Sequence, residues 1–392
     1  MRKLCHRPWF LPILFLACLI GFSCTPSGDD DSAGPGDDDV AGDDDAAVDD
    51  DSTVDDDTAT DDDTAPDDDA QPDDDTTLNP TCQWTVMDSG TKIDLYTAWG
   101  ASPTDVYAGG GIPFETNGVV LHYDGTTWSS SFSIPYLPVA SLWGASSTDI
   151  YAVAGGDIAM GAVFRDDGSH WKLAKIVWMS VLSSIWGSSP TDIYAAGMSA
   201  ASPSPLDWTA VVYHFDGQQW TKTLLGSWLS IFYAISGSSA SNVFAVGSDF
   251  EGEIAARFDG QTWSDISTGL STMPETSMYG VWVASESDAW AVGDNPDDSG
   301  ESKVFHYDGS SWSPQAIPAG NQLSGIWGSS PTDIFTVGYS NLTGNCVILH
   351  YDGSSWSPMK CDQGQILVGV WGTSSCNVFA VGSGGTILHY GK

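Results

Sequence analysis

Short segments in which apolar and polar positions alternate fill the chain from about residue 81 to its end. In the copy that runs from Leu323 to Ser357, four such segments cover residues 323–327, 334–338, 347–351 and 356–357. Alternation with a period of two and an excess of β-branched and aromatic residues predict β-strands. Asp-Gly and Ser-rich sequences between the segments predict tight turns, so each copy is expected to form a four-stranded antiparallel sheet.

The pattern recurs every 43 to 50 residues, and its two ends show that the copies form a ring. A repeat of this length with four short strands is typical of a β-propeller blade. The last copy stops at residues 389–392 without its fourth strand, whereas an isolated strand with Trp84 precedes the first copy. The first strand ends at Trp99, Trp143, Trp186, Ser236, Trp282, Trp327 and Trp371, and the fourth begins at Trp84, Trp128, Trp171, Trp220, Trp263, Trp312 and Trp356. We therefore predict an all-β fold over residues 81–392, a seven-bladed β-propeller whose N-terminal strand completes the last blade.

Residues 1–23 have the composition of a secretory signal peptide. Basic residues precede an apolar run from Trp9 to Phe22, which is short for a membrane span. Ser23 and Cys24 follow directly, as in the bacterial lipobox, and we expect Cys24 to carry lipid; a cleaved signal without lipid, or lipidation at Cys18, is the alternative. Acyl chains at Cys24 would hold the protein on a membrane without crossing it. We expect an outer-membrane lipoprotein of a bacterial cell envelope, facing the periplasm or the cell surface.

Residues 24–80 are predicted to be a disordered acidic linker. They contain eight Asp triplets, which supply twenty-four of the fifty-two acidic residues of the chain, and no basic residue. Self-repulsion and the lack of apolar residues keep such a segment solvated and extended. We expect a tether; an export signal and calcium binding are alternatives.

The charge of the remaining chain limits its partners. The formal net charge of the whole chain is −40, and residues 79–392 contain twenty-eight acidic and nine basic residues, a net charge of −19. Such a surface repels phosphate backbones, so we expect no nucleic acid partner. We expect a monomer.

Two polar features recur in the blades, and both are expected to be structural. The turn between the first two strands carries Asp in five blades and Asn in two, so we expect an Asx hydrogen bond there. The third strand carries a basic residue in each blade, and seven copies around a ring cannot converge on one metal or one bond. We expect each to be a hydrogen-bonding or stacking partner within its blade; the copies are His122, Arg165, His214, Arg257, His306, His350 and His389.

The connections that vary in length and composition predict the binding surface. In a propeller, the loops between the second and third strands and those between blades lie on one face, and such loops commonly carry recognition. Aromatic residues are concentrated in the loops around the third blade, where they could stack on a sugar ring or a peptide. The candidate ligand-binding residues are Trp178, Trp208, Trp228 and Tyr233.

Two further loops on this face are acidic. The candidate metal ligands are Asp294, Asp297, Asp298 and Glu301. Their spacing fits no standard calcium loop, so we expect solvated loops without a metal, with Ca²⁺ as the alternative. No other cofactor is expected.

With Cys24 acylated, the four cysteines that follow it predict two disulfides in an exported protein. Cys346 and Cys361 are equidistant from the centre of the Asp352-Gly353-Ser354-Ser355 turn and are therefore expected to face each other. This leaves Cys82 on the closing strand to pair with Cys376 in the same blade. A zinc site is the alternative, although no Cys-x-x-Cys spacing exists.

The sequences 326–335, IWGSSPTDIF, and 349–356, LHYDGSSW, resemble the repeat of secreted propeller lipoproteins of myxobacteria. They are more distantly similar to Kelch repeats and to the Asp-box repeats of sialidases and photosystem assembly factors. The resemblance covers about residues 83–390, but Asp stands directly before Gly here, unlike in the Asp-box. The arginine triad of a sialidase has no counterpart, because Arg165 and Arg257 are the only arginines after the signal region.

We expect a non-enzymatic, membrane-tethered binding or scaffold module without catalytic residues, whose ligand is a protein or a glycan. The alternative is a hydrolase or lyase that acts on polysaccharide with carboxylate pairs on the variable face.

Overall fold

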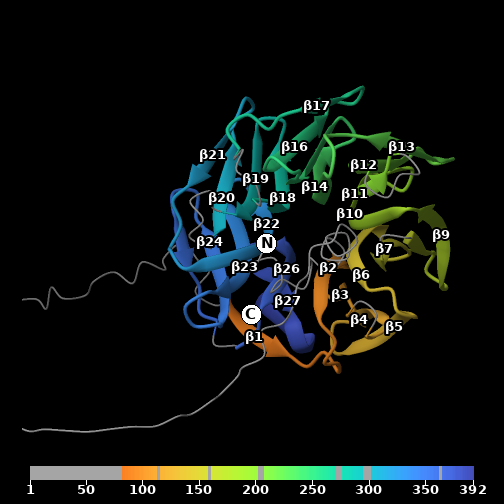
Figure 1. The fold of residues 1–392 in the computed structure, drawn as a ribbon. Coiled ribbons are helices and arrows are strands. Elements are labelled where there is room, and N and C mark those ends of the chain that lie inside the picture. The colour runs from red at the N-terminus through yellow and green to blue at the C-terminus, as the bar shows by residue number, and fades with distance from the viewer. Residues whose placement is uncertain are drawn as a thin grey trace, which may run out of the picture.

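Seven four-stranded antiparallel sheets are arranged around a central axis in the computed structural model (Figure 1). The structure describes residues 82–112, 115–157, 160–201, 207–270, 276–294, 302–361 and 364–392. This part of the chain is all-β, with one 3₁₀ turn, η3 (Ser383–Gly385). The predicted seven-bladed propeller is confirmed. None of the described helical segments has the length and apolar character that crossing a membrane requires.

Each of the first three blades uses four strands in chain order, from the axis outwards. The first blade contains β2 (Leu95–Ser102), β3 (Asp105–Gly110), β4 (Gly118–Tyr123) and β5 (Trp128–Ile134). The second contains β6 (Val139–Ser146), β7 (Asp149–Asp157), β8 (Met160–Asp166) and β9 (Trp171–Trp178). The third contains β10 (Ser180–Ser189), β11 (Asp192–Ala200), β12 (Trp208–Phe215) and β13 (Trp220–Leu224).

The next three blades repeat this order. The fourth contains β14 (Ile231–Ser239), β15 (Asn242–Ser248), β16 (Glu253–Phe258) and β17 (Trp263–Asp265). The fifth contains β18 (Met278–Ser285), β19 (Asp288–Asp294), β20 (Ser302–Tyr307) and β21 (Trp312–Gln315). The sixth contains β22 (Asn321–Ser330), β23 (Asp333–Ser340), β24 (Cys346–Tyr351) and β25 (Trp356–Pro358).

The seventh blade is built from both ends of the described chain. It contains β26 (Leu367–Ser374), β27 (Asn377–Gly382) and β28 (Ile387–Gly391), and β1 (Gln83–Met87) is its outermost strand. β1 pairs antiparallel with β28, with Trp84 opposite Tyr390. In Figure 1 the orange β1 accordingly lies beside the blue C-terminal strands. The predicted closure of the ring by the N-terminal strand is confirmed.

Both predicted disulfides are present. Cys82 is bonded to Cys376 with a Cα–Cα distance of 5.8 Å, and Cys346 is bonded to Cys361 with a Cα–Cα distance of 5.9 Å. The first bond joins residues 294 positions apart and links the closing strand to the turn between β26 and β27. It therefore adds a covalent link at the seam of the ring.

Tryptophans near the axis pack each blade against the next. In six of the seven interfaces, the indole at the end of one innermost strand lies over a glycine of the next blade, the residue after the equivalent position there. A Cβ added at Gly144 would lie 2.4 Å from Trp99 Cη2. Only glycine leaves room for so close an approach. The pairs are Trp99 with Gly144, Trp143 with Gly187, Trp186 with Gly237, Trp282 with Gly328, Trp327 with Gly372 and Trp371 with Gly100.

The interface between the fourth and fifth blades is different. Ser236 occupies the tryptophan position of β14, because it pairs with Phe244 as Trp99 pairs with Tyr107. The next blade has Val283 at the glycine position, where it pairs with Ala289 as Gly100 pairs with Val106. Val283 is buried in the core cluster of these two blades. At this interface the fourth blade thus contributes the smaller residue, Ser236, and the fifth blade contributes the larger one, Val283.

Candidate functional site

The innermost strand of every blade contains a β-bulge at the same place. In β2, Leu95 pairs with Gly110 and Thr97 with Gly109, so Tyr96 is the extra residue of this bulge. Bulges redirect side chains and often occur beside functional sites. The seven extra residues are Tyr96, Ala140, Ser183, Tyr233, Tyr279, Ser324 and Val368.

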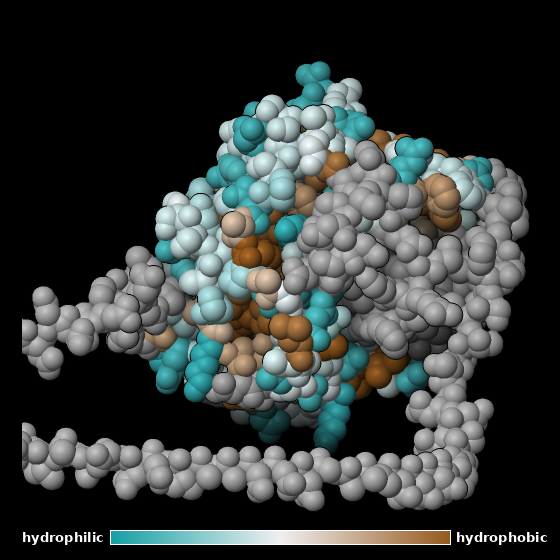
Figure 2. All heavy atoms as spheres, turned by 60° about the vertical axis from the view of Figure 1, so that its left-hand side comes forward, coloured by the Kyte–Doolittle hydropathy of each residue, from teal (hydrophilic) through white to brown (hydrophobic). Residues whose placement is uncertain are grey.

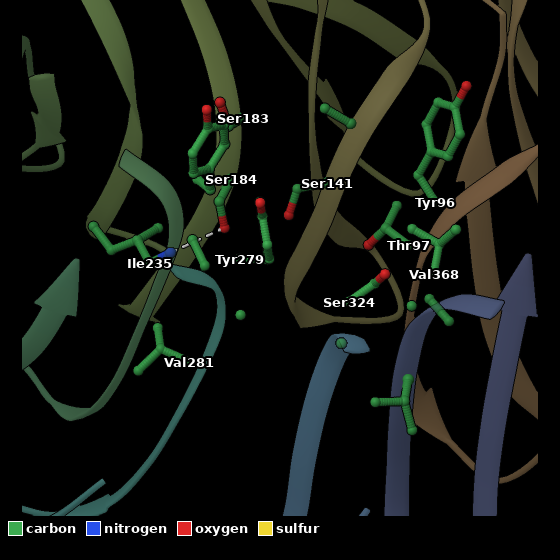
Figure 3. Close-up of a pocket in the computed structure, with 18 of the residues that line it drawn as sticks. Tyr96, Thr97, Ser141, Ser183, Ser184, Ile235, Tyr279, Val281, Ser324 and Val368 are labelled. Atoms are coloured by element: carbon green, nitrogen blue, oxygen red, sulfur yellow. Dashed lines mark hydrogen bonds between the residues drawn. The ribbon is translucent and has the colours of Figure 1, made fainter. Parts of the chain in front are cut away.

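These seven residues line one cavity of about 210 Å³ on the propeller axis. The cavity lies where the innermost strands begin, and its wall also includes Tyr339 and Ile366. It therefore lies at the face that carries the connections between blades and between the second and third strands, which we call the variable face. Figure 3 shows Tyr96, Ser141 and Ser184 around this space, each from a different blade.

The wall of the cavity is hydroxylic on one side. Thr97, Ser141 and Ser184 accept hydrogen bonds from the backbone N–H of Leu142, Ile185 and Ile235 of the next blade, at 3.2, 3.3 and 3.2 Å. These bonds join the first four blades across their interfaces.

The other side of the cavity has small residues at the equivalent positions. They are Ala234, Gly280, Gly325 and Gly369. A Cβ added at Gly369 would lie 2.6 Å from the carbonyl oxygen of Tyr96, so glycine permits the backbones to approach there. At these equivalent positions the cavity thus has hydroxyl side chains on one side and small residues on the other.

Tyrosines supply the aromatic surface of the cavity. The rings of Tyr233 and Tyr279, from adjacent blades, have centroids 5.7 Å apart. Burial, and secondly the charge of Asp94, raise the pKa of Tyr96 well above its usual value, so this phenol stays neutral. The cavity therefore offers rings and hydroxyl groups to a ligand.

Three successive connections between blades share a backbone feature at the variable face. Tyr136, Met179 and Leu229 have φ values of 58°, 53° and 56°, which few residues other than glycine adopt. Each lies within the connection that leads to the second, third or fourth blade. Strain of this kind often accompanies functional surfaces. An exposed aromatic stands at each place: Tyr136 itself is 65% exposed, Trp178 69% and Trp228 50%.

The predicted aromatic residues divide into three groups. Trp178 and Trp228 are exposed at the variable face. Tyr233 lines the axial cavity. Trp208 was predicted to contact a ligand, but it is 1% exposed and packs with Val181 and Met198 in the core, so it is not accessible. The four residues therefore do not form one site.

Sequence reasoning missed two residues of this face. Phe250 is 59% exposed, and its ring centroid lies 5.9 Å from that of Trp228. Tyr279 lines the cavity beside Tyr233. Its position in the bulge, equivalent to Tyr96 and Tyr233, is the signal that an alignment of the repeats offers.

The acidic candidates are mostly outside the described residues. Asp294 is the last residue of β19, and Asp297, Asp298 and Glu301 lie in the range that the structure does not describe. In the described ranges, no group of three His, Cys, Asp or Glu side chains is arranged to hold a metal ion. Cys24, the acidic linker and the signal region also lie outside the described residues.

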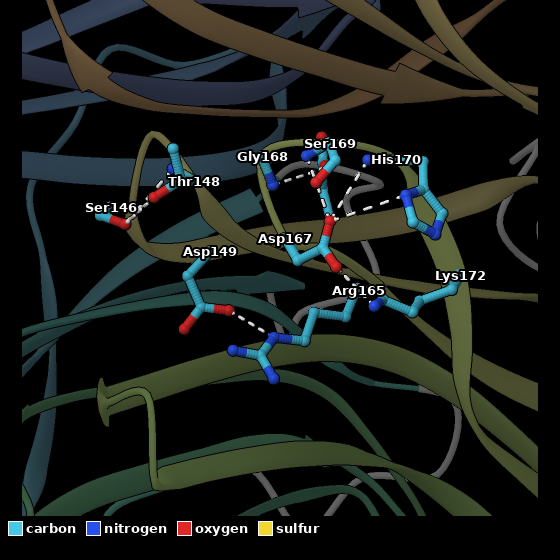
Figure 4. Close-up of polar contacts among 10 residues, drawn as sticks. Ser146, Thr148, Asp149, Arg165, Asp167, Gly168, Ser169, His170 and Lys172 are labelled. Atoms are coloured by element: carbon cyan, nitrogen blue, oxygen red, sulfur yellow. Dashed lines mark hydrogen bonds and ion pairs between the residues drawn. The ribbon is translucent and has the colours of Figure 1, made fainter.

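On the opposite face, which we call the turn face, the repeated polar residues bond to one another. Arg165 donates from Nε to Asp149 at 2.6 Å, and Figure 4 shows this pair beside the Asp167 turn. The same contact recurs in every blade: His122 with Asp105, His214 with Asp192, Arg257 with Asn242, His306 with Asp288, His350 with Asp333 and His389 with Asn377. The expected role of these basic residues within each blade is thereby observed.

Each of these basic residues also packs against an aromatic ring of the second strand. The rings of His122 and Tyr107 are stacked with centroids 4.4 Å apart, and Arg165 lies over Tyr151.

In the turn between the first two strands of a blade, the expected Asx hydrogen bond is not the main contact of the repeated Asp. Instead, Ser102 accepts from the N–H of Thr104, and the same serine bond recurs in five other blades.

The Asp-Gly turns between the third and fourth strands contain the Asx bonds. The Asp124 carboxylate accepts from the side chain and N–H of Thr126 and from the N–H of Thr127. The Thr126 hydroxyl, followed by these backbone donors, lowers the pKa of Asp124 to about 2. The polar groups of the turn face are thus engaged in the fold.

The described residues on the side of the molecule seen in Figure 2 are largely polar at the surface. In the view of Figure 2, hydrophilic and intermediate residues surround small groups of apolar residues.

No protein-family model matches the sequence, and no curated protein sequence matches it. The comparison that gives matches is the one with solved structures.

A structure of YCF48 bound to D1 peptide has a TM-score of 0.58 and 12% identity, and the match covers 79% of this chain and 97% of that chain. YCF48 from Cyanidioschyzon merolae has a TM-score of 0.57 and 10% identity, with 79% and 98% covered. A streptogramin B lyase structure has a TM-score of 0.58 and 11% identity, with 79% and 98% covered. At these identities the similarity establishes the propeller fold alone.

Proposed function

We propose that this protein is a membrane-anchored, exported binding propeller that takes a protein or glycan ligand on its variable face. The observation that carries the proposal is the axial cavity, to which all seven innermost strands contribute. Concave sites lined by aromatic rings and a few polar groups are the usual form of a ligand site. The turn face offers less to a ligand because its repeated polar groups bond within the blades.

The composition of the cavity wall favours binding over hydrolysis. Hydrolysis of a glycosidic bond commonly uses two carboxyl groups on either side of the bond. Tyrosines are the ionisable groups among the described residues that line the cavity. Rings and hydroxyls at these positions suit stacking and hydrogen bonding with a ligand that is not transformed.

An array of glycans and peptides, probed with the full chain in mild detergent, tests this function. Substitution Tyr279→Ala should abolish or strongly weaken the binding that the array detects, because it removes one ring from the cavity wall. Gln218→Ala, an exposed residue in an Asp-Gly turn of the turn face, is the control and should leave binding unchanged. Equal binding by the Tyr279 variant and the parent would place the ligand elsewhere.

The anchoring has its own test. In the proposed envelope location, Cys24→Ala should move the protein from the membrane fraction to the soluble fraction, because the acyl chains are lost. A Cys18→Ala variant is the matched control and should stay with the membrane. Continued sedimentation of the Cys24 variant with outer membranes would contradict lipidation at this residue.

A further inference from the structure

Two loops of the variable face meet beside the third and fourth blades. One is the connection from β13 to β14, which carries Trp228, and the other is the loop from β15 to β16, which carries Phe250. The Ser227 hydroxyl donates to Asp249 Oδ2 at 2.7 Å and ties the two loops together. Trp228 and Phe250 are thereby brought to a centroid distance of 5.9 Å with an angle of 50° between the rings.

Both rings remain open to solvent although their backbones are fixed. Trp228 is 50% and Phe250 59% exposed. Leu229 is held in the left-handed region, and its N–H donates to the Trp208 carbonyl at 2.7 Å. The Ser230 hydroxyl donates to the Ser227 carbonyl and accepts from the N–H of Ala210. A loop ordered in this way lowers the entropic cost of binding, because its backbone is already fixed.

The loop that carries Phe250 is acidic. Asp249 precedes the phenylalanine and Glu251 follows it, and the Asp249 carboxylate accepts from the N–H groups of Glu251 and Gly252. Within the described ranges, neither Asp249 nor Glu251 forms an ion pair. These two charges are part of the net charge of −19 over residues 79–392 and make the potential at this loop negative.

We propose that Trp228 and Phe250, together with the carboxylates of Asp249 and Glu251, bind an arginine or lysine side chain of a basic peptide segment in a protein partner. A cation is attracted to the face of an aromatic ring, most strongly to tryptophan, and two tilted rings with adjacent carboxylates provide both contributions. The charge of the surface selects the cationic partner over an anionic one. This inference rests on the proposed function, in that it places a binding residue pair on the same face and names the class of ligand.

Titration with a labelled peptide in which arginine alternates with serine tests the inference on the full chain in detergent. We expect binding that weakens as salt is raised, because exposed charges are screened. Trp228→Ala and Phe250→Ala should each weaken binding about tenfold. Glu251→Gln, which keeps the side-chain volume, should weaken it about threefold and reduce its salt dependence.

Leu342→Ala is the matched control. Leu342 is 84% exposed on the equivalent loop of the sixth blade, between Asn341 and Thr343, and should have no effect on peptide binding. A peptide with citrulline in place of arginine separates charge from shape and should not bind. Circular dichroism of each variant checks that the blades stay folded.

The outcomes separate the two proposals. Equal binding of the citrulline peptide, or equal binding by the Trp228 and Phe250 variants, would overturn the cation site. If a glycan or neutral peptide binds and is lost on Tyr279→Ala, while the arginine peptide does not bind or binds equally to the Trp228 variant, the cation site is wrong and the proposed function stands. If the arginine peptide binds and depends on Trp228 but not on Tyr279, the cation site stands and the axial cavity is not its ligand site.

Discussion

Trp371 of the last blade lies over Gly100 of the first blade. A Cβ added at Gly100 would lie 2.8 Å from Trp371 Cη2. This contact crosses the seam of the ring, where the Trp99 and Trp371 rings also have centroids 6.5 Å apart. The seam is therefore closed by the same Trp-over-Gly packing as five other interfaces, in addition to the pairing of β1 with β28 and the Cys82–Cys376 bond.

Replacing Gly100 by alanine should destabilise the propeller by about 1–3 kcal/mol, because the added methyl group overpacks the interface. The nearest atoms are the Asp105 carbonyl oxygen at 2.6 Å and the Trp371 ring, and the carbonyl belongs to the backbone and cannot move aside easily. Urea unfolding of the full chain measures the effect. Ala101→Ser, at the exposed neighbouring position, is the control. An unchanged midpoint for Gly100→Ala would show that the seam is looser than the geometry indicates.

The exchange at the interface of the fourth and fifth blades predicts coupling between Ser236 and Val283. Ser236→Trp alone should be destabilising because Val283 occupies the space that the indole needs, and Val283→Gly alone should be destabilising because it leaves a cavity. The double variant restores the Trp-over-Gly pair of the other six interfaces. In a double-mutant cycle, the double variant should therefore lose about 1–2 kcal/mol less free energy of unfolding than the sum of the losses of the two single variants. Additive losses would mean that the two positions are independent.

The two disulfides should contribute unequally to stability. The Cys346–Cys361 bond closes a loop of 15 residues, and its replacement by serines should cost at most about 3 kcal/mol by chain entropy. The Cys82–Cys376 bond spans 294 residues, so its loss should cost more than the ~4.7 kcal/mol of a 100-residue loop. Guanidinium unfolding of the two double-serine variants compares them, and non-reducing peptide mapping checks the pairing. A larger loss for the short loop would contradict the seam argument.

His389 should make the protein less stable in mild acid. Asn377 donates to His389 Nε2 at 3.0 Å, which requires a neutral imidazole, and burial lowers the pKa of His389. Because the folded pKa lies below the unfolded value of about 6.5, stability falls as the pH drops through the unfolded pKa towards the folded one.

Asn377→Asp should reverse this effect. It recreates the carboxylate–imidazole pair of four other blades, so the pKa of His389 should rise and less stability should be lost in acid. NMR titration of the imidazole and urea unfolding between about pH 7 and pH 5 test both statements. Gln218→Ala, on the same face, serves as the control. An unshifted imidazole titration would contradict the assigned hydrogen bond.

The sequence by itself determined the number of blades, the closure of the ring and both disulfides. Strand alternation and turn residues such as Asp352-Gly353 are local signals, and each was repeated often enough to be counted. The strand that contains Trp84 could be assigned to the last blade because that copy is the one that lacks a fourth strand. Cys346 and Cys361 followed from the register of one hairpin, which a tight turn fixes.

Only the tertiary structure decided which side chains reach the axial cavity and the surface of the variable face. The bulges that direct Tyr96, Tyr233 and Tyr279 into one cavity depend on how two strands pair, and no single strand reveals them. Trp208 has the same local setting as an exposed loop aromatic, yet packing between blades buries it. Phe250 meets Trp228 because a hydrogen bond joins two loops that are distant in the sequence. Alternation specifies which face of a strand is apolar, whereas convergence of residues from different blades arises only when the ring closes.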